Sequence, residues 1–273
     1  MTRQIKLLED ELGTTLFERS VSGSVPTESA RELLKYWKAC RLQLEDLEQK
    51  INEISNLSRG SVRIATAEGF VPDLQQQVIL PFSDIHPNIQ FTVEVLSVSE
   101  IVEAVADGIC HIGVAFNPPA SQRLVSIADV AIPLRLAVRP QHPLASHQGP
   151  LSVRKAFAYP LAMLTGSYGI RRLLDHVAYS EQTPLIPAIT TNSLHLAVEY
   201  ALNTNVGTFI DPFHISDHLN SGRLPSFKVE HPLLDSGRAS VLIRAGQTLP
   251  TAAREIVDWI LYKSKASRSV SSR

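Results

Sequence analysis

The sequence has little cysteine, no long apolar run and almost no net charge. Its two cysteines, Cys40 and Cys110, are too few for a disulfide framework, and we expect two buried thiols in a reducing compartment. No apolar run approaches the roughly 18 residues of a membrane span, and the N-terminus lacks the apolar core of a signal peptide. We therefore expect a cytoplasmic chain with no membrane partner.

Charges of the two signs are balanced, both overall and at the N-terminus. The 26 Lys and Arg against 27 Asp and Glu give a formal net charge of −1, and the first sixty residues hold nine basic and ten acidic side chains. Composition therefore gives no electrostatic reason to expect binding to nucleic acid or a membrane surface. The 273 residues can form one large or two ordinary domains with real cores.

An apolar stripe runs from Thr27 to Leu57, on a surface that is otherwise mostly charged. Its side chains recur three and four residues apart, as in a heptad seam, at Ala30, Leu33, Trp37, Cys40, Leu44, Leu47, Ile51 and Ile54. This period favours packing against another helix over burial within one subunit. The partner would be the same helix of a second copy or a helix just before it. We predict dimerisation through Leu33, Trp37, Cys40, Leu44, Leu47, Ile51 and Ile54.

Beyond residue 60, strand-like and helix-like segments alternate. Strands are expected at 62–65, 91–96, 109–116, 134–138, 161–164, 186–190, 206–210 and 241–243, and helices at 71–85, 99–106, 169–177, 193–202 and 251–263. Pro81 should bend or interrupt its helix. The alternation predicts an α/β fold of parallel sheets covered by helices, with ligands at the carboxyl ends of the strands.

The N-terminal residues carry a family resemblance. A short amphipathic helix, Thr2 to Leu12, is followed by Gly13, then by Leu16-Phe17-Glu18-Arg19 and a polar turn at 20–24. The stretch from Arg3 to Arg19 resembles the second half of the winged helix-turn-helix of LysR-type transcriptional regulators. A wing, a Thr-capped linker helix and an effector domain follow as in that family, so the resemblance covers essentially the whole chain.

The resemblance implies an α/β fold with three parts. Residues 1–26 would be a truncated winged helix-turn-helix and residues 27–58 a linker (dimerisation) helix. A two-lobed, periplasmic-binding-protein-like effector domain would follow, with lobe one at 61–131 and 238–273 and lobe two at 132–237. Family members usually assemble four subunits through paired linker helices, so we expect a homodimer or homotetramer.

Four turns place short polar residues at expected helix N-termini, where backbone N–H groups are free. They contain Thr66, Glu68, Gly69, Ser97, Ser99, Thr165, Ser167, Asn192 and Ser193. Helix capping alone could explain each turn, but the resemblance implies that together they bind a small-molecule effector between the lobes. Glu68 stands where the family usually has a small or hydroxyl side chain. Because a carboxylate repels anions, we expect the effector not to be a simple carboxylate, unless Glu68 points outward.

The resemblance assigns contacts with DNA to Thr2, Arg3, Gln4, Lys6 and Arg19. Base contacts come mainly from the N-terminal end of a recognition helix, and Met1 falls in the middle of that helix. We therefore expect weak or no DNA binding by this chain, and promoter DNA as a partner of the full-length form. Met1 would be either the true start or an internal methionine of a longer protein.

The sequence shows no convergent catalytic or metal-binding set. Gly166-Ser167-Tyr168-Gly169 lacks the spacing of a nucleophile elbow, and His214 and His218 lack the accompanying Glu or Cys of a zinc site. We expect no enzyme activity, no cofactor and no metal. A transcriptional regulator is the leading interpretation. The alternative is a stand-alone solute-binding protein of the same two-lobed fold, which the heptad helix and the missing signal peptide disfavour.

Overall fold

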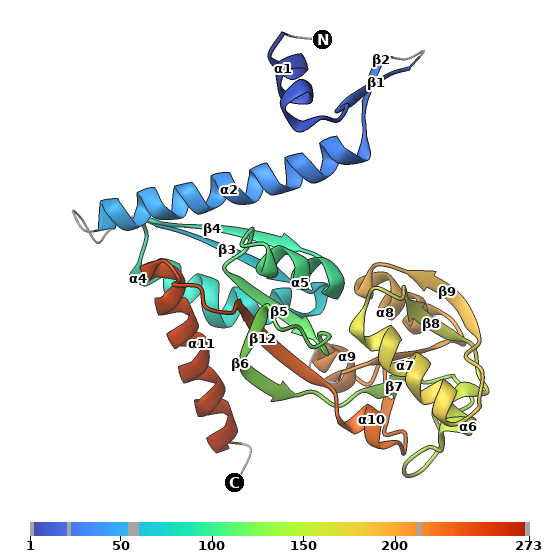
Figure 1. The fold of residues 1–273 in the computed structure, drawn as a ribbon. Helices are drawn as coiled ribbons and strands as arrows, with labels where there is room; N and C mark the ends of the chain where they lie inside the picture. Colours follow the sequence, from blue (N-terminus) through green and yellow to red (C-terminus); the bar gives the residue numbers. More distant parts are fainter. Residues whose placement is uncertain (1–2, 21–22, 54–59, 212–214, 271–273) are drawn as a thin grey trace. The chain divides into compact units, whose positions relative to one another are not determined.

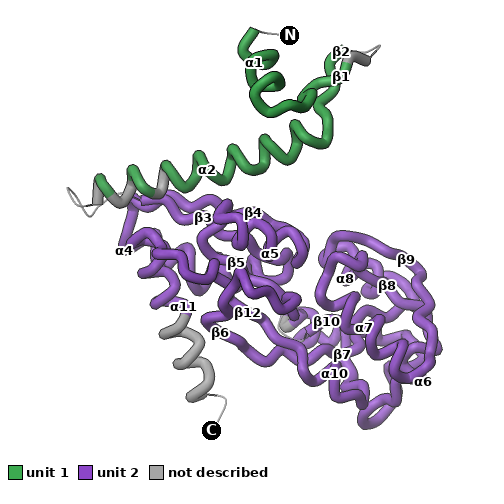
Figure 2. The backbone as a smooth tube through the Cα atoms, in the orientation of Figure 1, with its two compact units in different colours: residues 1–57 green, residues 58–273 purple. Residues whose placement is uncertain are grey.

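The computed structural model describes residues 3–20, 23–53, 60–211 and 215–270. The chain divides into two compact units, residues 1–57 and residues 58–273, which are coloured separately in Figure 2. None of the described helices is long and apolar enough to cross a membrane.

The first unit begins with a helix and a hairpin. Its elements are α1 (Arg3–Leu12), β1 (Phe17–Ser20), β2 (Gly23–Pro26) and α2 (Glu28–Glu53) (Figure 1). Gly13 follows α1 with a φ of 63°, a conformation that glycine adopts without strain. The Glu9 carboxylate accepts hydrogen bonds from the backbone of Leu16 (2.7 Å) and Phe17 (3.2 Å), which ties α1 to the hairpin.

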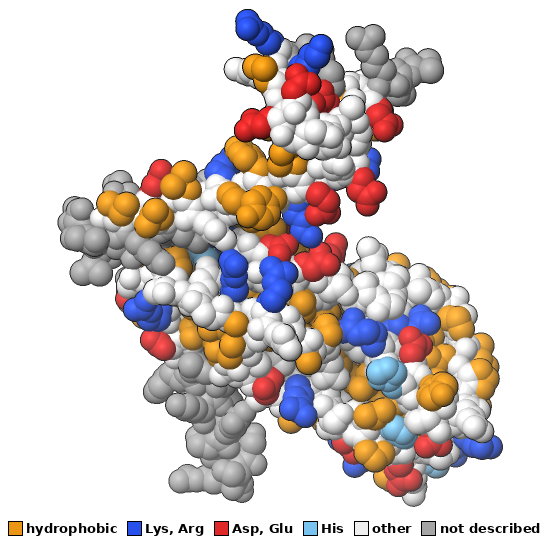
Figure 3. Space-filling model, viewed as in Figure 1, with side chains coloured by type: hydrophobic (Ala, Val, Ile, Leu, Met, Phe, Trp, Pro, Cys, Tyr) orange, Lys and Arg blue, Asp and Glu red, His pale blue; other side chains and the backbone are white. Residues whose placement is uncertain are grey.

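The long helix α2 exposes most of its apolar seam. Thr27 is its N-cap as predicted, because the Thr27 hydroxyl accepts a hydrogen bond from the Ala30 amide at 3.2 Å. The side chains of Trp37, Leu44, Leu47 and Ile51 are between 52% and 56% exposed, and Figure 3 shows apolar side chains along α2. The expectation of two buried thiols was wrong: Cys110 is buried, but Cys40 is exposed on this helix. Leu33 is half-buried, and Ile54 lies outside the described residues.

The second unit contains two five-stranded sheets. The first has the order β4 (Ile89–Val95), β3 (Gly60–Thr66), β5 (Ile112–Phe116), β12 (Arg238–Arg244) and β6 (Leu124–Ala131). The second has the order β11 (Ser226–Phe227), β7 (Arg135–Ala137), β10 (Gly207–Ile210), β8 (Leu161–Leu164) and β9 (Pro187–Thr191). We call the first sheet with its helices lobe one, and the second sheet with its helices lobe two. The chain leaves the first sheet after Ala131 and returns at Arg238.

Helices cover both sheets. Lobe one has η1 (Glu68–Phe70), α3 (Val71–Leu74), η2 (Gln75–Ile79), α4 (Leu80–Ile85), α5 (Val98–Ala106) and α11 (Thr251–Val270). Lobe two has α6 (Val153–Phe157), α7 (Gly169–Ser180), α8 (Leu194–Asn203), α9 (Ser216–Asn220) and α10 (Pro232–Asp235). Successive residues of β3 face opposite sides, so that Ile64 packs with the α4 and α11 side and Ala65 with the α5 side. Lobe one is therefore a sheet with helices on both faces.

Both sheets mix parallel and antiparallel strands, whereas the alternation of strands and helices favoured parallel sheets. β3 is parallel to β4 and β5, but β12 is antiparallel to β5 and β6, and β7 is antiparallel to β10. Strand β6 was not predicted because Ser126 and Asp129 interrupt its apolar pattern. The structure accounts for Asp129, whose carboxylate accepts hydrogen bonds from the hydroxyls of Ser126 (3.0 Å) and Ser240 (2.5 Å).

Pro81 interrupts its helix as expected. A π-helical turn, η2, separates α3 from α4, and Pro81 lies in the first turn of α4. Proline has no N–H to donate to the carbonyl four residues earlier, that of Gln77. The indole N–H of Trp259 on α11 donates to this carbonyl instead, at 3.1 Å. The break in the helix thus becomes an attachment point for α11.

Two adjacent crossing segments join the lobes. The amide of Ile132 donates to the carbonyl of Gly237 at 2.7 Å, and that of Leu134 donates to Leu234 at 2.8 Å. A side chain on Gly237 would place its Cβ 2.3 Å from the carbonyl oxygen of Ile132, so only glycine fits this approach. One cluster of buried apolar side chains, including Phe116 and Ile132, continues from lobe one into lobe two.

Candidate ligand-binding site between the two lobes

The N-terminus of α5 is closed by residues of its own chain segment. Ser97 and Glu100 form a capping box: the Glu100 carboxylate accepts from the Ser97 amide at 2.9 Å, and the Ser97 hydroxyl accepts from the Glu100 amide at 3.5 Å. Hydrogen bonds to the Glu100 carboxylate, first from the Ser97 side chain and then from the Ser97 backbone, lower the pKa of Glu100 below its ordinary value. Both residues face the space between the lobes.

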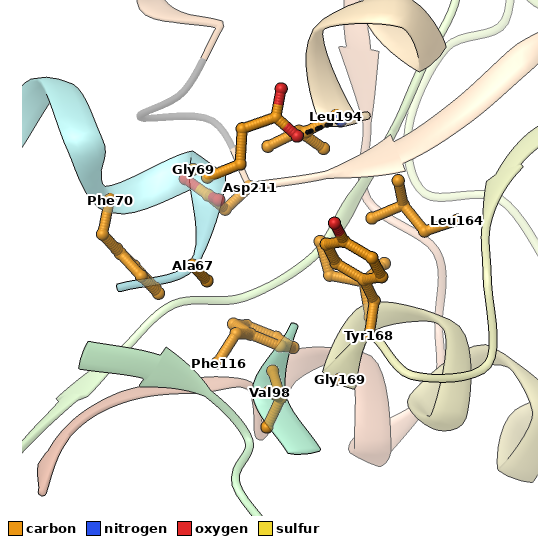
Figure 4. Close-up of a pocket in the computed structure, with 12 residues that line it drawn as sticks. Ala67, Gly69, Phe70, Val98, Phe116, Leu164, Tyr168, Gly169, Leu194 and Asp211 are labelled. Atoms are coloured by element: carbon orange, nitrogen blue, oxygen red, sulfur yellow. Dashed lines mark hydrogen bonds between the residues drawn. The ribbon is translucent and has the colours of Figure 1, made fainter. Parts of the chain in front are cut away.

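The N-terminus of α8 is closed from the opposite lobe. Glu68 begins η1, two residues after the end of β3 in lobe one, and its carboxylate accepts three hydrogen bonds in lobe two. The donors are the hydroxyl of Ser193 (3.1 Å) and the amides of Leu194 (2.5 Å) and His195 (3.2 Å). Figure 4 labels Leu194, and its dashed line marks the hydrogen bond that the Leu194 amide donates. Glu68 thus points into the cleft, and the outward orientation left open by the sequence does not occur.

Tyr168 connects two turns of lobe two. Its hydroxyl donates to the carbonyl of Asn192 at 2.5 Å, and next to it the hydroxyls of Thr165 and Ser167 share a hydrogen bond of 3.1 Å. Burial, followed by the negative charges of Glu68 and Glu100, raises the pKa of Tyr168 above its ordinary value. The phenol therefore stays neutral and can donate this hydrogen bond at neutral pH.

Among the described residues, two cavities are lined by both lobes. The larger is polar and has a volume of about 820 Å³, within the usual range of small-molecule sites. Its polar lining consists of Ser97, Glu100, Thr165, Ser167, Tyr168, Thr190, Thr191 and Asn192. The smaller cavity is lined largely by apolar side chains, among them Phe70, Phe116 and Leu164 (Figure 4). Its volume is about 30 Å³, room for one or two water molecules.

Arg172 and Gly169 of α7 bring lobe two against the end of β5. The Arg172 guanidinium donates to the carbonyls of Ser167 in lobe two (3.1 Å) and Asn117 in lobe one (3.2 Å). Burial lowers its pKa from the ordinary value. A side chain on Gly169 would place its Cβ 2.0 Å from the carbonyl oxygen of Phe116. The backbones of the two lobes are in direct contact here.

Comparison with known proteins identifies the family. The LysR substrate binding domain matches residues 55–264. The chain belongs to the LysR family. It is 26% identical to the RuBisCO operon transcriptional regulator of Allochromatium vinosum, across 98% of this chain and 87% of that protein.

Solved LysR-family structures share the fold. The full-length regulator CbnR, solved in complex with its target DNA, matches with a TM-score of 0.67 and 16% identity, over 95% of this chain and 88% of that chain. The regulatory domain of CcmR from Synechocystis PCC6803, solved in complex with 2-PG, matches with a TM-score of 0.66 and 15% identity. The match covers 76% of this chain and 98% of that chain. The predicted two-lobed α/β effector-domain fold is therefore confirmed, and the chain's relatives are transcriptional regulators.

The structure brings most of the residues predicted to bind an effector into the cleft. Ser97, Thr165, Ser167 and Asn192 line the larger cavity, and Glu68 and Gly69 line the smaller one. Ser193 lies at the N-terminus of α8, where it bonds Glu68. Two other residues lie elsewhere. Thr66 is completely buried, with its hydroxyl donating to the carbonyl of Ala67, and Ser99 is exposed on α5 but lines neither cavity.

Sequence reasoning missed several residues of the candidate site, among them Glu100, Tyr168 and Arg172. Glu100 completes a Ser-x-x-Glu pattern with Ser97, which is a readable capping signal. Tyr168 directly follows the predicted Thr165–Ser167 turn. This position beside predicted site residues is the only signal that could have placed Tyr168 in the site. Arg172 gave no signal, because nothing in a helical arginine indicates that it reaches the other lobe.

The residues predicted to contact DNA belong to the first unit. Arg3, Gln4 and Lys6 are exposed on α1. Thr2 lies outside the described residues, and Arg19 is on β1 but its side chain is not described. Their assignment to DNA stays a prediction.

Two histidines of the described ranges are buried and accept hydrogen bonds from backbone amides. His111 is completely buried, and its Nδ1 accepts from the amide of Arg63 at 3.1 Å. His142 is also buried; its Nδ1 accepts from the amide of Leu144, and burial, followed by the charge of Arg139, lowers its pKa. His214 lies outside the described residues. Within those residues, no group of three His, Cys, Asp or Glu could hold a metal ion.

Proposed function

We propose that the larger cavity is the effector site of this LysR-family regulator, and that the effector controls transcription by changing how the two lobes meet. The observation that carries the proposal is a polar cavity lined by both lobes, with Ser97 and Glu100 on one side and Thr165, Ser167 and Asn192 on the other. A ligand that bonds both sides stabilises one lobe arrangement over others in proportion to its differential affinity. As a regulator of transcription, the protein would act in the cytoplasm.

Thermal-shift screening of a metabolite panel, followed by calorimetry, tests this site. Replacing Thr165 by Val, which keeps the shape but removes the hydroxyl, should weaken the best compound about fivefold to tenfold, as expected for one lost hydrogen bond. Ser99→Ala is the matched control, because Ser99 is on the same helix as Glu100 but lines neither cavity. Equal affinities for wild type and Thr165→Val would exclude this cavity as the effector site.

The exposed seam of α2 is proposed as the contact with a second copy. Leu44, Leu47 and Ile51 are more than half exposed at heptad spacing, and pairing would remove this apolar surface from water. Analytical ultracentrifugation of Leu44→Asp should show dissociation to monomers at concentrations where Gln43→Asp, which adds the same charge one residue away, remains dimeric or tetrameric. An unchanged oligomer in Leu44→Asp would show that α2 does not hold the subunits together.

Contact with DNA is proposed for Thr2, Arg3, Gln4, Lys6 and Arg19. The exposure of Arg3 and Lys6 on α1 supports this, since basic side chains that neutralise phosphates bring a salt-dependent affinity. Fluorescence anisotropy with duplex DNA at low salt should show weaker binding for Arg3→Ala than for Arg154→Ala, an arginine on α6 of lobe two. Equal binding by the two variants would contradict the assignment.

A further inference from the structure

The Glu68 carboxylate occupies the position at which a helix N-terminus binds anions. The first amides of a helix have no partner within the helix, and the helix dipole favours negative charge there. In α8 the amides of Leu194 and His195 both donate to Glu68. The Ser193 hydroxyl donates to Glu68 while accepting from the Leu196 amide, the next free donor of the first turn. These donors at the start of α8 therefore already have hydrogen-bond acceptors within the chain.

The linings of the two cavities supply no cation that could balance an anion. The described residues that line the two cavities include three carboxylates, Glu68, Glu100 and Asp211, but no Lys, Arg or His. The nearby guanidinium of Arg172 is directed to two backbone carbonyls. An incoming carboxylate or phosphate would meet negative charge without a compensating cation, which costs free energy in a partly desolvated cleft.

The contact also joins the two lobes directly. Glu68 and Ser193 are 125 residues apart in the chain, and the cavity behind them holds only about 30 Å³. The three hydrogen bonds therefore hold lobe one against α8 in the way that a ligand anion bridging the two lobes would.

We propose that Glu68 is a tethered ligand that fills the anion position of the cleft, so that this regulator takes a neutral or cationic, hydroxyl-bearing effector rather than a carboxylate or phosphate. This inference rests on the proposed effector site but concerns its charge selectivity. The effector binds beside Glu68, in the cavity lined by the hydroxyls of Ser97, Thr165 and Ser167. An anion can bind at α8 only where Glu68 is removed.

Chemical rescue with acetate tests the proposal without the effector or DNA. Glu68→Ala opens the α8 N-terminus to a small carboxylate. Sodium acetate at 50 mM, compared with sodium chloride of equal ionic strength, should raise its melting temperature by about 2–4 °C. Wild type and Glu68→Gln should not respond, because their side chains still fill the position; inorganic phosphate should likewise leave wild type unchanged. Stabilisation of wild type by acetate or phosphate, or no response in a folded Glu68→Ala, would overturn the proposal.

A distance measurement keeps the test decisive if Glu68→Ala proves too unstable to melt cooperatively. Spin labels at Val125→Cys in lobe one and Tyr179→Cys in lobe two, both exposed positions, report the separation of the lobes in a Cys40→Ser background. Glu68→Ala should broaden or lengthen the distance distribution, and acetate should restore it. Glu100→Ala removes a carboxylate that bonds only within lobe one and should leave it unchanged. An unchanged distribution in Glu68→Ala would refute the tether, whereas failure to find any effector would count only against the proposed function.

Discussion

The N-termini of α5 and α8 use the same chemistry with opposite connectivity. Each begins after a serine whose hydroxyl accepts from the first turn, and each has a glutamate that completes the cap. At α5 the glutamate is Glu100, three residues from Ser97 on the same helix. At α8 it is Glu68, which belongs to the other lobe. A local cap stabilises one helix whatever the lobes do, whereas the cap on α8 exists only while the lobes are together.

The N-terminus of α7 is where we expect a substitution to reduce the free energy of unfolding most. It has no side-chain cap, and Gly169 contacts the backbone of Phe116 directly. Gly169→Ala would place a methyl group 2.0 Å from the Phe116 carbonyl oxygen, so the lobes must shift apart. We expect a loss of about 2–3 kcal/mol in the free energy of unfolding, measured by urea denaturation. Gly166→Ala, whose methyl meets nothing within 4 Å, is the control; equal losses in both variants would contradict the steric explanation.

Removing the carboxylate from α8 should have the next largest effect. Glu68→Ala deletes three hydrogen bonds to a charged acceptor, and we expect a loss of about 1–2 kcal/mol in the free energy of unfolding. Glu68→Gln should lose about half as much, because its amide oxygen can still accept while the charge opposite the helix dipole is gone. Urea denaturation of the three proteins measures this order. A Gln variant less stable than the Ala variant would show that shape and hydrogen bonding are not what the site requires.

The two caps also show how far sequence reasoning reaches. The α5 cap lies within Ser97-Val98-Ser99-Glu100, and its helix was predicted with a boundary one residue from the observed one. The turn at Glu68 was predicted as part of a ligand site because it is a polar turn at an expected helix N-terminus and the family resemblance places effectors at such turns. Its partner was not predictable, since nothing within Glu68 or Ser193 encodes a contact across 125 residues. That contact arises only when two separately folded sheets meet. The contact of Arg172 with the other lobe was not predictable for the same reason. Strand β6 was missed because polar residues interrupt its apolar pattern.

Breaking the local cap should cost less than breaking the inter-lobe one. Ser97→Ala removes the hydroxyl that accepts from the Glu100 amide, and we expect a loss of about 1 kcal/mol in the free energy of unfolding. The spacing between the lobes should not change, because both partners are in lobe one. Urea denaturation together with the lobe-distance measurement separates this result from that for Glu68→Ala. A change of lobe distance in Ser97→Ala would remove the distinction between the two caps.

The smallest effect concerns the pH dependence of the local cap. Folding lowers the pKa of Glu100, first through the hydrogen bond with the Ser97 side chain and then through that with its backbone. A lowered pKa means that the ionised carboxylate stabilises the fold above the ordinary glutamate value of 4.5, and that this contribution is lost as the pH falls through the folded-state pKa. The stability difference between wild type and Glu100→Gln should therefore be constant from pH 7 to about pH 5 and shrink below it. Because the carboxylate is well exposed, we expect only a few tenths of a kcal/mol. Urea denaturation at several pH values measures it, and a difference that grew on acidification would mean that the neutral acid, not the carboxylate, caps α5.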